Sequence, residues 1–178
     1  MWDGYRFEEN GKKLIQTEIN FCGESMYFQI SENGNNYIAY WRTEPDRYKR
    51  GEFMCKSVFL FPELMPLSEL VKTKEYKELL QEYSPVYSAV LNENQKNIIQ
   101  TFLKTGLNEN ADIPCGRDGH SYCMEVYRPE YRKYHCWCRL PEEWSIMADV
   151  INMLVDISQA DRQKYGAEIY TEKFQFTP

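Results

Sequence analysis

Alternating hydrophobic and polar positions fill the first third of the chain and predict an antiparallel meander. Asn10-Gly11 and Asn33-Gly34 are strong signals for tight hairpins, and Cys22-Gly23-Glu24 offers a further turn between them. Between the second and third turns, one face of a strand would carry Met26, Phe28 and Ile30, while Tyr27 and Gln29 point the other way.

Residues 53–61 also alternate, which favours another strand. One side of this strand would carry Phe53, Cys55, Ser57, Phe59 and Phe61. We therefore expect about five strands before residue 62.

Helical spacing replaces this alternation in the middle of the chain. Thr73 can cap a helix that runs to Tyr83, with apolar residues on one face. Asn92 can cap a second helix, because Gln95 stands where a capping box needs it and Gly106 suits the end. Pro141 opens a third helix, whose broad apolar face comes from Met147, Ile151, Leu154, Val155 and Ile157.

A second hairpin lies between these helices. Residues 120–127 and 132–140 read as strands joined by the turn Arg128-Pro129-Glu130-Tyr131, and residues 167–176 alternate like a last strand. The pattern predicts an α+β fold: a mainly antiparallel sheet, built from the N-terminal meander and this hairpin, covered on one face by about three helices. We expect one domain over 1–178, with a division into 1–61 and 62–178 as the alternative.

Composition supports a folded, acidic protein. The hydrophobic fraction is 43% and the net charge is −6, with 14 tyrosines. Such apolar content argues against disorder, and the acidic balance argues against nucleic-acid binding, which needs a basic face. No signal segment or membrane span is visible, so we expect a cytoplasmic protein with reduced thiols and no membrane partner.

The segment 111–141 gathers both histidines and four of the six cysteines. A zinc-stabilised interaction module would use Cys115, Cys123, Cys136 and Cys138, since Cys123 could lie near Cys136 or Cys138 across the hairpin. The spacing matches no standard zinc pattern, however, and free cysteine commonly packs as a small hydrophobic residue. We therefore predict no metal and no cofactor.

An enzyme of unknown reaction is the other alternative, with a site near His120, Cys115 and Glu125. Cysteine catalysis needs a thiolate beside a base. Residues 120 and 123 face opposite sides of a strand, so His120 cannot serve Cys123, while Cys115 lies in a loop that could approach a histidine. We found no other catalytic motif.

The open face of the sheet is where we expect function. It should carry the candidate binding residues Trp41, Tyr127, His135, Trp137 and Arg139, of which Trp137 among charged neighbours is the most typical interface anchor. In composition and layout the chain resembles bacterial immunity and antitoxin proteins, a resemblance that assigns no residue a role. We expect a non-enzymatic protein-binding module, of the immunity or inhibitor type. Its acidic charge favours a basic protein partner.

Overall fold

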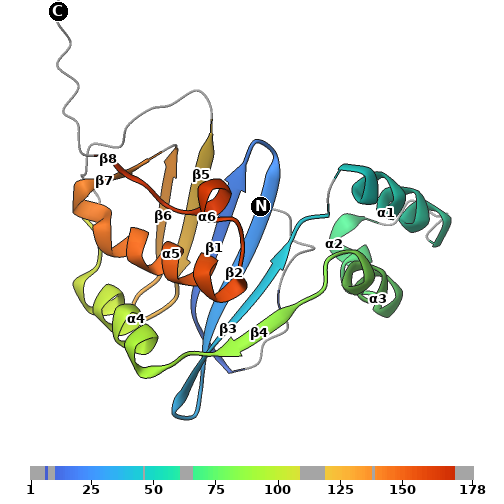
Figure 1. Cartoon of the computed structure of the whole chain (residues 1–178). Coiled ribbons are helices and arrows are strands. Elements are labelled where there is room, and N and C mark those ends of the chain that lie inside the picture. Colours follow the sequence, from blue (N-terminus) through green and yellow to red (C-terminus); the bar gives the residue numbers. More distant parts are fainter. Residues whose placement is uncertain are drawn as a thin grey trace, which may run out of the picture.

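A six-stranded antiparallel sheet forms the centre of the protein (Figure 1). The computed structural model describes residues 7, 11–45, 47–60, 66–108, 119–137 and 139–170. In the order β4-β3-β2-β1-β5-β6, the strands are Tyr87–Val90, Asn36–Thr43, Glu24–Asn33, Lys12–Phe21, His120–Val126 and Arg132–Trp137. A short parallel pair, β7 (Leu140–Pro141) and β8 (Ile169–Tyr170), lies apart from it. The predicted α+β class is confirmed.

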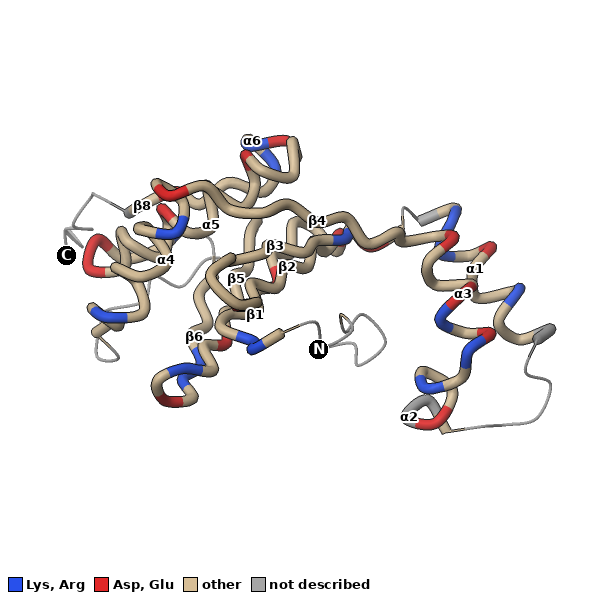
Figure 2. Tube along the Cα trace, turned by 90° about the horizontal axis from the view of Figure 1, so that it is seen from below, with Lys and Arg blue, Asp and Glu red and all other residues tan. Residues whose placement is uncertain are grey.

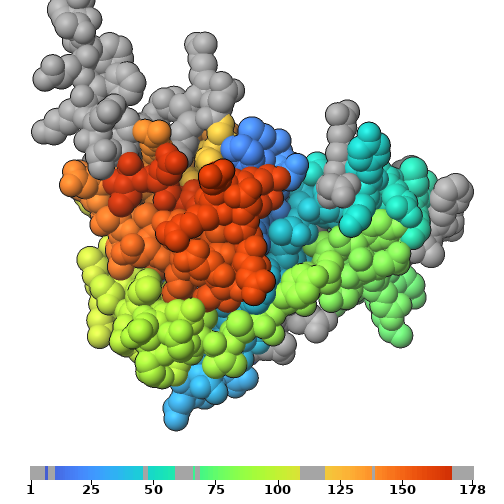
Figure 3. Space-filling model, in the orientation of Figure 1, coloured from blue at the N-terminus to red at the C-terminus, as the bar shows by residue number. Residues whose placement is uncertain are grey.

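Helices occupy two places around this sheet. The bounds are α1 Arg47–Leu60, α2 Leu67–Leu70, α3 Lys74–Tyr83, α4 Glu93–Thr105, α5 Ser145–Ser158 and α6 Arg162–Tyr165, with the 3₁₀ helix η2 at Glu142–Trp144. Figure 2 shows α4, α5 and α6 on one face of the sheet, whereas α1, α2 and α3 stand at one end of it. In Figure 3 the side chains of α4, α5 and α6 hide most of the covered face.

The helix starts predicted at Thr73 and Asn92 are confirmed by their capping bonds. The Thr73 hydroxyl accepts a hydrogen bond from the Tyr76 backbone N–H at 3.3 Å. The Asn92 side chain accepts from the Gln95 N–H at 3.0 Å, and the Gln95 side chain accepts from the Asn92 N–H at 2.8 Å, which is a complete capping box. These bonds satisfy N–H groups that the first helical turn leaves without partners. After Pro141 the chain first forms the 3₁₀ helix η2, and α5 begins at Ser145 without a side-chain cap.

The predicted hairpin turns within the described meander are also confirmed. Cys22 and Gly23 have φ values of 50° and 84° and join β1 to β2, and Gly34 has φ 59° between β2 and β3. A hairpin turn of two residues requires such positive φ values, which glycine adopts without strain. The hairpin expected at Asn10-Gly11 and the end of the strand expected at 167–176 lie outside the described residues.

Both faces of β2 are buried, and each belongs to a different apolar cluster. Met26, Phe28 and Ile30 pack in the main core with residues of α4 and α5. Tyr27, on the other face, belongs to a second cluster with the residues Phe7, Phe53, Tyr76, Leu79 and Leu80. The alternation seen in the sequence therefore separates two cores, and the second one attaches α1 and α3 to the sheet.

The strand predicted at residues 53–61 is wrong, because most of this segment is helix α1. Phe53 and Ser57 are buried and Cys55 is exposed, as one face of a helix requires. The Phe53 ring meets the rings of Tyr76 and Tyr83 on α3 edge-on, with centroids 5.6 and 5.7 Å apart. This packing against a later helix decides the conformation. The domain division after residue 61 stays a prediction, although α1 and α3 on either side of it share this cluster.

Candidate functional site

The β5–β6 hairpin presents a ladder of mostly polar side chains on the face of the sheet opposite α4 and α5. Backbone pairing sets Ser121 opposite Trp137, Cys123 opposite His135 and Glu125 opposite Lys133. Successive side chains alternate between faces, so these six share one face, while Tyr122, Met124, Tyr134 and Cys136 are buried in the main core on the other. We call Tyr127, Tyr131, Lys133, His135 and Trp137, together with Glu125, the open strip.

Glu125 anchors the open strip. It is only 9% exposed, lies 3.3 Å from Lys133 Nζ and accepts a 2.7 Å hydrogen bond from the Tyr127 hydroxyl. Burial by itself raises the pKa of this carboxyl, but the hydrogen bonds from Tyr127 and Lys133 outweigh burial and leave the pKa below its ordinary value. The side chain is therefore a carboxylate at neutral pH.

A row of hydrogen bonds continues from Tyr127 across β1 and β2. The Tyr127 hydroxyl also lies 2.7 Å from Gln16 Oε1, and since it has one hydrogen it donates to either Gln16 or Glu125 at a time. Gln16 Nε2 donates to Gln29 Oε1 at 2.9 Å, and Gln29 Nε2 donates to Ser31 at 3.0 Å. Gln29 and Ser31 are almost fully buried, so this row ties the open strip to the inside of the protein.

Aromatic side chains give the open strip its exposed surface. Trp137 is 51% exposed and Tyr131 is 60% exposed. The Trp137 ring meets the His135 ring edge-on with centroids 5.8 Å apart, and Tyr131 meets Tyr127 in the same way at 5.7 Å. Lys13 Nζ lies 4.8 Å from the centroid of the Tyr127 ring, which adds a cation–π contact.

Two of the predicted binding residues lie outside this strip. Trp41 stands opposite Phe28 on the helix-covered face, where its ring stacks on Tyr87 with centroids 6.1 Å apart. It cannot share a surface with Trp137, and this part of the prediction was wrong. Arg139 follows β6 and pairs with Glu168 at 3.1 Å, at the edge of the strip.

The structure does not bring the predicted catalytic residues His120 and Glu125 together. His120 lies on the helix-covered face of β5, where its Nε2 donates to the Lys164 carbonyl oxygen at 2.6 Å and its ring stacks on Tyr122. Glu125 is on the opposite face, and Cys115 lies outside the described residues. His120 therefore links β5 to α6, and it has no contact with Glu125 that catalysis could use.

The cysteines considered as zinc ligands are also separated. Cys123 is on the open face, whereas Cys136 is fully buried on the other face and donates to the Arg139 carbonyl oxygen at 3.0 Å. Cys115 and Cys138 lie outside the described residues, and among the described ones no three His, Cys, Asp or Glu side chains come together as metal ligands. Of the two neighbours considered for Cys123, Cys136 points to the opposite face, because the two cysteines are offset by one residue in the register.

The thiol of Cys123 is a poor nucleophile in this setting. Burial raises its pKa, and the carboxylates of Glu125 and Glu18 raise it further, against the opposing effect of Lys133. The neutral thiol, the weaker nucleophile, therefore predominates at neutral pH.

Sequence reasoning missed the glutamine row. Gln16 and Gln29 occupy polar positions of strands β1 and β2, which the alternation alone marks as solvent-facing. Two signals could have revealed the row. Gln16 pairs directly with Gln29 in the register, and Tyr127 continues the outward positions of β5. Reading them required knowing that β5 pairs with β1.

Comparisons with known proteins identify no relative. No family model, no curated protein and no solved structure matches the chain. In the part of the chain that the structure describes, no helix has both the length and the apolar character needed to cross a bilayer.

Proposed function

We propose that this protein is a non-enzymatic protein-binding module that contacts its partner through the open strip of β5 and β6. The observation that carries the proposal is the half-exposed Trp137 ring on strand β6, in contact with the His135 ring and opposite Ser121 of β5. Tryptophan and tyrosine supply large contact areas at small entropic cost and are frequent anchors of protein interfaces.

The strip is held in shape before a partner arrives. The ion pair of Glu125 with Lys133 and the hydrogen bonds of Tyr127 fix the polar side chains next to the aromatic rings. A surface that is already ordered loses less conformational entropy when it binds. This supports a specific protein contact over a loose hydrophobic one.

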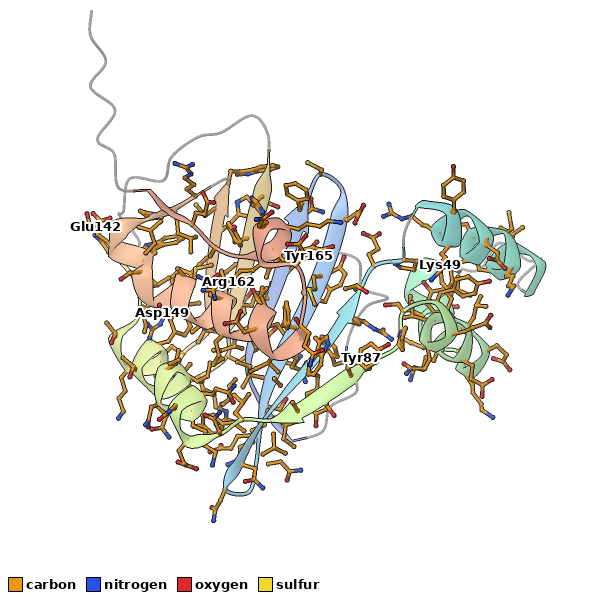
Figure 4. All side chains as sticks on the ribbon, viewed as in Figure 1. Lys49, Tyr87, Glu142, Asp149, Arg162 and Tyr165 are labelled. Carbon is orange, nitrogen blue, oxygen red and sulfur yellow. The ribbon has the colours of Figure 1, made fainter. Side chains whose placement is uncertain are left out.

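The acidic charge of this protein favours a basic partner, as expected if it is an immunity or inhibitor-type protein. Lys133 and Arg139, within and beside the strip, are paired with the carboxylates of Glu125 and Glu168, which neutralises their charges locally. The whole chain carries a net charge of −6. Exposed carboxylates also lie on the helical layer, where Figure 4 shows Glu142 and Asp149 at the end of the molecule remote from Lys49. An acidic protein of this kind attracts a basic partner at long range.

Affinity capture with matched variants tests the proposal. Trp137→Ala removes the central ring, and Tyr87→Ala is the control, because Tyr87 is an aromatic residue of similar exposure, 53%, on the opposite edge of the sheet. Proteins from the source cells that the wild type and the control retain, and that Trp137→Ala loses, would be true partners. Loss of an anchor costs about 2 kcal/mol or more, which is about 30-fold in Kd.

The isolated pair then gives the decisive measurement. Titration calorimetry of the purified partner with each variant should show the weakened binding for Trp137→Ala alone, and an affinity that falls as salt is added. Equal binding by all three proteins would place the contact elsewhere and end the proposal for this surface.

A further inference from the structure

Strand β4 is the end strand of the sheet, and its outer edge is open. It pairs with β3 on one side, and no described strand lies on its other side (Figure 1). The side chains of Tyr87 and Val90 on this short strand are 53% and 63% exposed. An open edge that carries exposed apolar side chains can pair with a strand of another molecule.

The hydrogen bonds between β3 and β4 show which backbone groups face the open edge. The Leu91 N–H donates to the Tyr37 carbonyl oxygen at 2.8 Å, so the backbone groups of Leu91 point toward β3. The direction alternates along a strand, and Ala89 therefore also bonds toward β3. The N–H and C=O groups of Ser88 and Val90 consequently point away from β3, toward the open edge.

Natural sheets usually protect an open edge, and β4 lacks the usual devices. Charged side chains, proline within the strand and bulges are the common ones. The chain carries no charged residue from Ser84 to Asn92, and the pairing of β4 with β3 has no bulge. Pro85 precedes the strand and leaves its outward N–H groups in place. Two molecules of net charge −6 can therefore meet along this strand without placing carboxylates opposite each other.

The sequence of this edge is complementary to itself. An antiparallel second copy of the run Val86-Tyr87-Ser88-Ala89-Val90, aligned at Ser88, sets Ser88 opposite Ser88 and Val86 opposite Val90. It also sets the large Tyr87 opposite the small Ala89. Residues whose backbone groups point outward then face each other, as the hydrogen-bonded pairs of an antiparallel ladder require.

Backbone groups of both copies would be satisfied in this alignment. The Ser88 N–H of each copy would donate to the Ser88 carbonyl oxygen of the other, and the Val90 N–H would donate to the Val86 carbonyl oxygen. The Val86 N–H, which donates to Gln81 Oε1 at 3.3 Å, can keep that bond. The two sheets would join into one continuous sheet.

We propose that the outer edge of β4 binds the same edge of a second copy of this chain, in the antiparallel alignment centred on Ser88. Only a short strand takes part, so the contact belongs to the weak class of interfaces. The open strip stays free, because β5 and β6 form the opposite side of the sheet. Each copy in the dimer could therefore still bind a partner protein.

Sedimentation velocity on the full chain tests the proposal, from about 10 µM to about 1 mM, the range in which weak contacts associate. The wild type should shift from monomer to dimer over this range. Ser88→Glu sets the carboxylates of the two copies opposite each other and should weaken association about fivefold or more. The control is Gln100→Glu, which makes the same change of charge at an exposed position of α4 and should leave association unchanged.

A charge swap tests the alignment at Ser88. Ser88→Lys alone should also associate more weakly than the wild type, because two ammonium groups would face each other. An equimolar mixture of Ser88→Glu and Ser88→Lys should associate more tightly than either variant alone, since each carboxylate then faces an ammonium group. Only a residue that lies opposite itself in the dimer gives this pattern.

Proline tests the backbone pairing. Ser88→Pro removes an outward N–H and leaves the bonds to β3 in place, whereas Ser88→Ala keeps the N–H. Association should be lost in the proline variant alone, with circular dichroism confirming that both variants fold. A monomer at every concentration would overturn the proposal. So would association that survives Ser88→Glu, or a mixture of the charged variants that associates no better than its components.

Discussion

Glu125 is the residue whose replacement tests the open strip most directly. Glu125→Gln keeps the size and the hydrogen-bonding shape of the side chain but removes its charge. The Tyr127 hydroxyl can still donate to the amide oxygen, as a neutral bond, and the attraction to Lys133 is lost. Any change in stability therefore reports the charge and not a cavity.

The expected cost follows from these two contacts. A hydrogen bond to a charged group contributes about 1 kcal/mol more than a neutral one. Lys133 has a side chain that is 51% exposed, so water replaces part of its lost contact. The neutral amide is also cheaper to bury than the carboxylate. We expect a loss of about 1–2 kcal/mol in the free energy of unfolding, seen as a fall of about 3–6 °C in Tm for a protein of this size.

The direction of the pKa shift determines how the stability contribution of Glu125 changes with pH. The pKa of Glu125 is lowered in the folded protein, so its carboxylate stabilises the fold above its unfolded pKa and stops doing so as the pH falls through its folded value. The difference between wild type and Glu125→Gln should therefore shrink below about pH 4. Glu44 acts in the opposite direction, because burial raises its pKa, but it is common to both proteins and cancels in the comparison.

Urea unfolding followed by tryptophan fluorescence at several pH values measures this difference. Glu24→Gln is the control, because Glu24 is half-exposed and pairs with Lys164 at the surface, which should contribute less than about 0.5 kcal/mol. If Glu125→Gln were as stable as the wild type at neutral pH, or if its deficit did not change with acidification, the reasoning about this carboxylate would be refuted.

Three other changes have defined outcomes in the same unfolding assay. Asn92→Ala should cost about 1 kcal/mol because it removes the cap of α4, whereas Asn94→Ala in the first turn should cost much less. Ile151→Ala, in the fully buried core, should cost about 2–5 kcal/mol. Gly51→Ala should stabilise by up to about 1 kcal/mol, while Gly23→Ala should destabilise by about 1–2 kcal/mol, since only Gly23 has a positive φ; equal effects of the two glycine changes would contradict this account.

Short sequence patterns correctly predicted the features that depend on neighbouring residues, such as caps and turns. The caps Thr73 and Asn92, the glycine turn after β1 and the alternation of the β5–β6 hairpin were all readable, because each depends on residues a few positions apart. The α1 segment was not, since Phe53 and Ser57 fit both a strand and a helix, and contacts with α3 decide between them.

The sequence could show which residues of one hairpin share a face, but not which face of the sheet the helices cover. Alternation placed His135 and Trp137 together correctly. It could not show that Trp41 belongs to the other face, because the pairing of β3 with β2 and the path of α4 decide which face the helices cover. The separation of Cys123 from Cys136 likewise depends on a register that the turn sets.

The position of β1 in the middle of the sheet has a consequence for synthesis on the ribosome. Its partner β2 emerges directly after it, but β5, which pairs along its other edge, is translated about a hundred residues later. Until then a nascent chain exposes a long strand edge that could join a neighbouring polypeptide. Premature termination before β5 would leave that edge bare for good, so truncated products of this protein should aggregate.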